Sequence, residues 1–259
     1  MIRILMATDL SAEAELAQRR AEFLAETVSG TLRIVHVRNT ETTCKTDSAT
    51  IESIPGDPYD IISDLTHDAD LLVLGEPRRR TAGHLFTGTT GERIIRRSAA
   101  PVLVVRTETE THYRRVLLAV DLTADSLDIM RTSKSLGLTS APCDVVYAYK
   151  SPQADMMIEA ATYSFDDIRR HIAQQHRDYR KKLKMLMKKA GISGGATAIP
   201  IRASAASTIL SHAKKIRADL IILGSRRRSN LARLVLGSVA AQVLSHAKTD
   251  VLIVPPDPD

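Results

Sequence analysis

The sequence predicts an α/β protein made of two doubly wound domains in tandem. Short runs rich in Val, Ile and Leu alternate with segments of helical periodicity along the chain. Continuous apolar strands alternating with helices indicate a parallel sheet covered on both faces. The pattern also occurs twice, because blocks of the second half match the first half without gaps. We therefore expect two Rossmann-like five-stranded parallel sheets, each with the strand order 3-2-1-4-5.

Two offsets define the internal repeat. The matching blocks are 2–12 with 114–124 and 33–38 with 145–150 at an offset of 112, and 69–75 with 218–224 and 102–105 with 251–254 at an offset of 149. Each block of the second copy carries the same kind of apolar run as its partner in the first. The repeat therefore predicts one domain at 1–110 and a second at 112–259.

Within the first copy, apolar runs predict five strands and helical spacing predicts three helices. The expected strands are 3–8, 32–37, 49–54, 70–75 and 102–106, and the expected helices lie at about 12–28, 58–68 and 88–98. We expect the last strands of the two copies, 102–105 and 251–254, to pair across a pseudo-twofold, since unpaired they would be exposed, adhesive edges.

The second copy contains a helix that the first copy lacks. The offsets differ by 37 residues, and most of the insertion is one segment, 164–191, with apolar residues at helical spacing, two Asp in its first turn and Gly191 placed to stop it. Its many Lys and Arg could form a nucleic-acid or membrane face, but a solvated outer face is the default. The first copy's sheet should then be covered by this long helix reaching across, or by a second chain in a homodimer.

Composition restricts the partners and the compartment. A formal net charge of +6 favours anionic partners, whereas the absence of Trp and an aromatic content of 3% disfavour single-strand stacking, so we rank nucleic acid low. No segment approaches the ~18 apolar residues of a membrane span, and we expect a cytoplasmic protein. Cys44 and Cys143 lie in no metal or disulfide spacing and are expected to be packing residues, without a zinc site.

The candidate ligand sites lie at strand ends. Ligands of a doubly wound sheet bind beyond the carboxyl ends of the strands, where the strand order reverses. There each copy has an Asp after its first strand, a Gly ending its fourth, and a Gly–Thr or Gly–Ser pair opening its last helix, whose start favours anions. The expected site residues are Asp9, Gly75, Gly88 and Thr89 in the first copy and Asp121, Gly224, Gly237 and Ser238 in the second.

The sequence resembles a tandem universal stress protein. The resemblance rests on ATDLS and AVDLT at the first strands, on residues 218–256 and on the shorter match at 69–106. Nucleotide-binding members of that family carry Gly, two residues, Gly, nine residues, Gly, then Ser or Thr, and cradle the phosphates of ATP there. Their first-strand Asp and the end of their second strand hold adenine and ribose. The resemblance therefore adds Val37 and Tyr149 to the expected sites.

The middle Gly of this motif is replaced by Arg78 in the first copy and by Arg227 in the second. An Arg held in the left-handed region would cost about 1 to 2 kcal/mol and its side chain could fill the phosphate space. Alternatively the loop takes another path and the guanidinium clamps phosphate oxygens, or the basic loop is merely solvated. We favour the second copy for ATP, because Pro77 stiffens the first copy's loop.

The resemblance implies a non-catalytic stress-response protein for binding or signalling, with ATP or another adenine nucleotide as ligand and Mg²⁺ only alongside it. No metal-protease, P-loop, dinucleotide or nucleophile-elbow motif occurs, so no catalytic residue is assigned. The alternatives are a nucleotide-independent interaction protein with vestigial pockets and a weak ATPase. We expect a homodimer or an intrachain pseudo-dimer, with an unknown protein partner.

Overall fold

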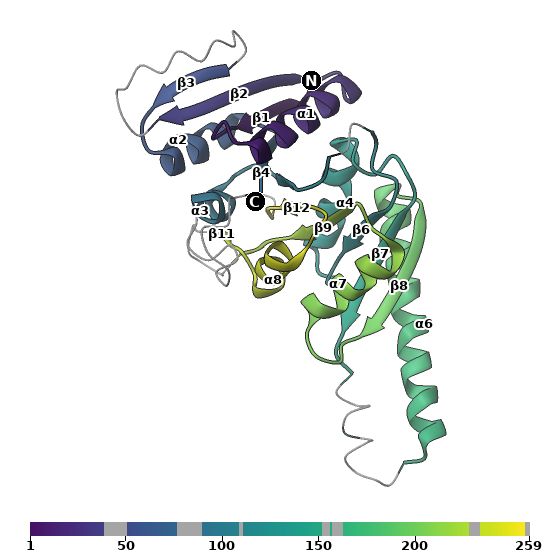
Figure 1. Cartoon of the computed structure of the whole chain (residues 1–259). Helices are drawn as coiled ribbons and strands as arrows, with labels where there is room; N and C mark the ends of the chain where they lie inside the picture. The colour runs from purple at the N-terminus through teal and green to yellow at the C-terminus, as the bar shows by residue number, and fades with distance from the viewer. Residues whose placement is uncertain are drawn as a thin grey trace.

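A computed structural model of the chain describes residues 1–38, 51–76, 90–108, 111–151, 156, 163–227 and 234–256. Ten strands form one sheet in the order β3-β2-β1-β4-β5-β12-β9-β6-β7-β8 (Figure 1). The expected α/β class and the expected strand order of each half are confirmed. The division into independent domains at 1–110 and 112–259 stays a prediction.

The N-terminal half supplies one side of the sheet. Its elements are β1 (Arg3–Ala7), α1 (Ala12–Thr27), β2 (Thr31–Arg38), β3 (Ile51–Pro55), α2 (Pro58–Leu65), the short 3-10 helix η1 (Thr66–Asp68), β4 (Leu71–Gly75), α3 (Thr90–Arg97) and β5 (Val102–Val105). All strand pairs within this half are parallel. Local sequence explains several helix starts: Ser11 caps α1, and Asp57 caps α2 ahead of Pro58.

The C-terminal half supplies the other side. Its elements are β6 (Val116–Ala119), α4 (Asp125–Ser135), β7 (Cys143–Tyr149), α6 (Phe165–Ala190), β8 (Gly194–Pro200), α7 (Ala205–Ile216), β9 (Leu220–Gly224), β10 (Arg226–Arg227), β11 (Leu234–Val235), α8 (Ser238–His246) and β12 (Asp250–Val254). Helices α1, α4 and α6 pack on one face of the sheet, and α2, α3, α7 and α8 pack on the other. Both faces therefore carry an apolar core.

The two halves meet in one antiparallel strand pair. Leu103 of β5 lies opposite Leu252 of β12, with Val104 opposite Val251 and Val102 opposite Ile253. Since 103 and 252 are equivalent positions of the repeat, the pairing is symmetric about them. The pseudo-twofold axis therefore passes through the Leu103–Leu252 pair, and the predicted pairing of the last strands is confirmed.

The strand registers correct the sequence alignment by one residue. Thr8 N donates to Val35 O, and its repeat counterpart Val120 N donates to Val146 O. The second strands therefore match at an offset of 111 rather than 112, and Val37 is level with Ala148 instead of Tyr149. A shift of one residue moves a strand side chain to the opposite face. Accordingly Val37 faces the α2 side of the sheet, whereas Tyr149 faces α6.

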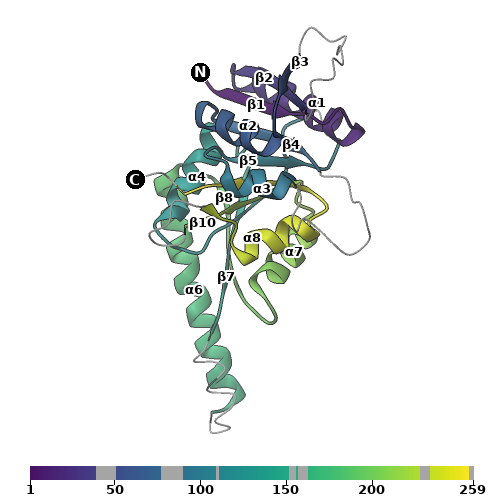
Figure 2. The same ribbon diagram turned by 90° about the vertical axis from the view of Figure 1, so that its left-hand side faces the viewer.

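The inserted helix forms as predicted. A capping box between Ser164 and Asp167 starts α6, and Gly191 ends it in the left-handed conformation with φ 65°. Its strand contacts are with β7 and β8, at the far edge of the sheet from β3 (Figures 1 and 2). The expectation that this helix might reach across to cover the first copy's sheet is therefore wrong. Cover by a second chain stays a prediction.

A buried carboxylate ties the two halves together. The Asp250 side chain is fully buried and accepts hydrogen bonds from Arg106 N at 2.8 Å, Thr107 N at 3.0 Å, Thr107 Oγ1 at 2.9 Å and Tyr113 Oη at 2.7 Å. The Arg20 guanidinium, from α1, lies 3.9 Å from the same carboxylate. Burial, and then the Asp250 charge, raise the pKa of Tyr113, which keeps its hydroxyl protonated as a donor.

We expect Asp250→Ala to lower the free energy of unfolding by about 3 to 5 kcal/mol, because it leaves Arg20 buried without its carboxylate and removes four hydrogen bonds. Glu52→Ala is the control, since Glu52 pairs with Arg33 in solvent and should cost within about 1 kcal/mol. Urea unfolding measures both. Equal losses in the two variants would contradict a special role for Asp250.

Candidate functional site

A left-handed leucine follows the first strand of each half. Leu10 has φ 61° and Leu122, its repeat counterpart, has φ 60°. Positive φ is unfavourable for a residue with a Cβ and occurs where the surrounding structure imposes it. The same backbone path is thus retained twice, directly after Asp9 and Asp121, at the carboxyl ends of the central strands. The sequence gives no signal for this conformation, since leucine is not a residue that favours it.

The two aspartates hold these turns together. Asp9 Oδ1 accepts from Ser11 N at 3.0 Å. Asp121 Oδ1 accepts from Thr123 N at 3.2 Å and from Thr123 Oγ1 at 2.6 Å, and Ser126 Oγ lies 3.3 Å away. Both aspartates are exposed. Each carboxylate therefore supports its own turn at the carboxyl end of its strand.

The glycines that end the fourth strands, Gly75 and Gly224, differ in the contacts that would exclude a side chain. A Cβ on Gly75 would lie 2.6 Å from the backbone oxygen of Glu13, so helix α1 alone excludes a side chain there. A Cβ on Gly224 would lie 2.5 Å from the tip of the Ile129 side chain, which can move. Gly75 is therefore explained by packing, without a ligand. At Gly224 packing excludes a side chain less strictly, because the Ile129 side chain could move aside.

The loop after Gly224 begins and ends as a hairpin. Arg226 pairs with Val235 and Arg227 with Leu234, in antiparallel register. The backbone of Arg227 thus lies in an extended strand. An extended Arg227 favours the alternatives without a left-handed arginine, and its role toward phosphate stays a prediction.

The helix that follows this hairpin has an open start. Gly237 is the N-cap of α8, no side chain in the described part of the chain caps it, and its first turn holds no acidic residue. Ser238 opens the helix and is exposed. Since α8 leads back to β12, which runs parallel to β9, its N-terminus lies at the carboxyl edge of the sheet. Free N–H groups and the positive helix end make this a place for an anion.

The corresponding helix of the N-terminal half differs. Its first turn contains Glu92, a buried carboxylate that accepts from Arg96 Nη2 at 2.5 Å. The repeat counterpart of Glu92 in α8 is an alanine, Ala241. A carboxylate in the first turn competes with an anionic ligand for the positive helix end. The remaining expected residues of this half, Arg78, Gly88 and Thr89, lie outside the described residues.

Tyr149 is part of an aromatic cluster rather than a free wall of the site. Its side chain is 1% exposed, and its ring lies 6.0 Å from that of Tyr147 and 4.7 Å from that of Tyr179 on α6. Burial, then the charges of Tyr179 and Asp121, raise the pKa of Tyr147. Sequence reasoning missed Tyr147, although its alternation with Tyr149 along β7 placed both on one face.

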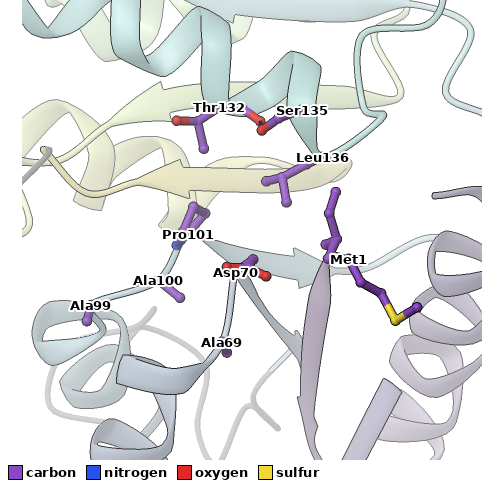
Figure 3. Close-up of a pocket in the computed structure, with 10 residues that line it drawn as sticks. Met1, Ala69, Asp70, Ala99, Ala100, Pro101, Thr132, Ser135 and Leu136 are labelled. Carbon is purple, nitrogen blue, oxygen red and sulfur yellow. Dashed lines mark hydrogen bonds between the residues drawn. The ribbon is translucent and has the colours of Figure 1, made fainter. Parts of the chain in front are cut away.

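A cavity of about 450 Å³ lies away from these strand ends (Figure 3). It is bounded by residues that precede β1, β4 and β5, including Asp70 and Pro101, and by Thr132, Ser135 and Leu136 in the last turn of α4 and just beyond it. Its walls are mainly Ala, Pro, Leu and Met side chains. It belongs to the amino ends of the N-terminal strands and is therefore separate from the expected ligand sites.

Comparisons with known proteins agree with this fold. The model of the universal stress protein family matches residues 45–106 and 112–255. The chain belongs to the universal stress protein family. This match includes every described strand and helix of the C-terminal half and, in the N-terminal half, the elements from β3 to β5, without β1, α1 and β2.

Individual relatives are distant. Universal stress protein E homolog of Haemophilus influenzae is 27% identical over 79% of this chain and 65% of its own length, so the chain spans just under two thirds of that relative. A functionally unknown protein of Pseudomonas aeruginosa PAO1 has a TM-score of 0.70 at 19% identity, covering 98% of this chain and 92% of its own. A universal stress protein of Archaeoglobus fulgidus has a TM-score of 0.63 at 16% identity, covering 98% of both chains. These structures share the fold.

The described residues lack two kinds of site or segment. No group of three or more His, Cys, Asp or Glu side chains there is placed to hold a metal ion. Within the same residues, no helix combines the length and apolar character needed to cross a membrane.

The left-handed turn can be tested by substitution at Leu10, which is 50% exposed. Leu10→Gly should be about 1 kcal/mol more stable than Leu10→Ala, because only the glycine relieves the positive φ. At Glu22, exposed in the middle of α1, the same pair should show the opposite order, with alanine better. Thermal unfolding measures all four variants. The strain is absent if alanine is the better residue at both positions.

Proposed function

We propose that this universal stress protein binds an adenine nucleotide in its C-terminal half, at the carboxyl ends of β6 and β9, and acts as a binding or signalling module without chemistry of its own. The observation that carries the proposal is the open start of α8, without a side-chain cap or an acidic residue in its first turn. It lies at the edge of the sheet where β6 and β9 are neighbours. That edge is the strand-order switch point of a doubly wound sheet.

The proposed contacts divide between phosphate and nucleoside. The N–H groups of the first turn of α8, with the Ser238 hydroxyl, would hold phosphate oxygens. The Asp121 carboxylate, which already orients Thr123 and Ser126, would face the ribose. Tyr147, whose pKa the Asp121 charge raises, would offer an aromatic surface to the base. Arg227 would supply a guanidinium to the phosphates from the hairpin that rises after β9.

The N-terminal half is the weaker candidate. Its glycine at the end of β4 is accounted for by the backbone of α1, and Glu92 occupies the first turn of α3. A negative charge at that helix start disfavours a second anion by electrostatic repulsion. We therefore propose one nucleotide per chain, with Mg²⁺ only as a counterion of a bound triphosphate.

The test is calorimetry with ATP, ADP and AMP at nucleotide concentrations up to the millimolar range. Ser238→Ala combined with Arg227→Ala should weaken ATP binding more than tenfold, because charge-assisted phosphate contacts contribute roughly 1.5 to 3 kcal/mol each. The control is Thr89→Ala combined with Arg78→Ala, the equivalent positions of the first copy, which should leave the affinity unchanged.

Other results would reassign the site. No heat of binding with any of the three nucleotides would refute the proposal. Binding that appears only in Arg227→Gly would show that Arg227 obstructs the site instead of clamping phosphate. Equal losses in the two double variants would mean that both halves bind. Release of phosphate from ATP that Asp121→Ala abolishes would identify a weak ATPase.

A further inference from the structure

Helix α6 carries the whole excess positive charge of the chain. The protein has 36 Lys and Arg against 30 Asp and Glu, a net charge of +6. Nine of the basic residues and three of the acidic residues lie in α6, which leaves 27 of each elsewhere. A helix face that only needs to be solvated usually mixes both signs. The segregation of charge on one element is instead the electrostatic signature of a surface for a polyanion.

The basic side chains form a stripe on the outer side of this helix. Arg177, Lys181, Lys184 and Lys188 are all exposed and recur at spacings of 4, 3 and 4 residues, which puts them on one face. Leu183, Met187 and Ala190 are buried and pack against the core from the opposite side. At about 1.5 Å per residue the stripe is roughly 16 Å long.

Nothing in the described part of the chain neutralises this stripe. No ion pair joins any of these four side chains to a carboxylate among the described residues, and Arg177 donates to Gln174 Oε1. Asp178, the only acidic side chain of α6 beyond its first turn, accepts from Gln174 instead. The element packed beside the end of α6 is α4, and it adds another cation, Lys134, which bonds to Gly191 O.

The C-terminal part of α6 packs on the body of the protein, and its N-terminal part extends beyond it. Its buried side chains all lie in its last eight residues, Leu183–Ala190, and its N-terminal part projects past the end of the sheet (Figures 1 and 2). Arg177 and Lys181 lie just before the packed stretch and Lys184 and Lys188 lie within it, so the row of cations runs along the solvent side of a helix that the core holds in place. Beside the row of cations, the apolar residues Leu183, Met187 and Ala190 face the core, so they are not available for insertion into a membrane interface.

We propose that the outer face of α6, defined by Arg177, Lys181, Lys184 and Lys188, binds the phosphate backbone of duplex nucleic acid. The low aromatic content argues against single strands, which are held by stacking, and does not bear on a duplex, which presents regularly spaced phosphates. The contacts are to phosphate and sequence-independent, since lysine acts as a point charge without base readout.

The test is fluorescence anisotropy of the full-length protein with labelled duplexes of DNA and RNA of about two helical turns, titrated at several salt concentrations. With four cations engaged, the slope of log K against log salt should be about −3 to −4. Lys181→Gln, Lys184→Gln and Lys188→Gln together should reduce the slope by about 2 to 3 and weaken binding at least tenfold at low salt.

The matched control removes the same charge elsewhere. Lys214, Lys215 and Lys248 are exposed lysines outside α6, and their joint replacement by Gln should leave binding and slope nearly unchanged. Circular dichroism checks that α6 stays helical in both triple variants. Equal losses in the two variants would overturn the proposal in favour of net charge alone. So would the absence of duplex binding at low salt, whether or not polyglutamate or anionic vesicles bind the same face.

Discussion

The antiparallel pairing of β5 with β12 is the constraint on which the rest of this molecule depends. It joins two parallel half-sheets into one ten-stranded sheet and buries two strands that would otherwise be open edges. Because the pair is antiparallel, all the other strands of one half run opposite to those of the other. The carboxyl ends of the two halves therefore lie at opposite edges of the sheet. The candidate sites of the two halves therefore share no strand end.

That separation explains why the two sites could diverge. Both halves retain a left-handed leucine and the aspartate before it, so they share the conformation of this turn. The starts of the last helices are not equivalent: one turn contains Glu92, while the other is open. Helix α6, which covers β7 and β8, belongs to the C-terminal half only. The carboxyl ends of the strands therefore carry different chemical groups in the two halves.

Much of this architecture could be predicted from the sequence because its signals are local. Apolar runs located the strands of the main sheet, and the first-turn aspartates and Gly191 bounded α6. The register of β7 was off by one, because one residue fewer lies between the first and second strands of the second copy and the apolar pattern tolerates either alignment. The burial of Arg20 had no local signal, since its carboxylate lies 230 positions away, at Asp250. The left-handed backbone conformation of Leu10 likewise had no signal in the sequence.

The fusion of the two copies has a consequence at the pseudo-twofold axis. In a homodimer with this interface, every substitution would appear on both sides at once. Here the position equivalent to Asp250 is Pro101, so one side acquired a buried carboxylate with its four hydrogen bonds while the other remained neutral. Two such charges near one axis would have repelled each other in a dry interior. Because the two copies are covalently linked, the chain can carry the buried carboxylate in one copy alone. A homodimer of identical subunits would carry it in both.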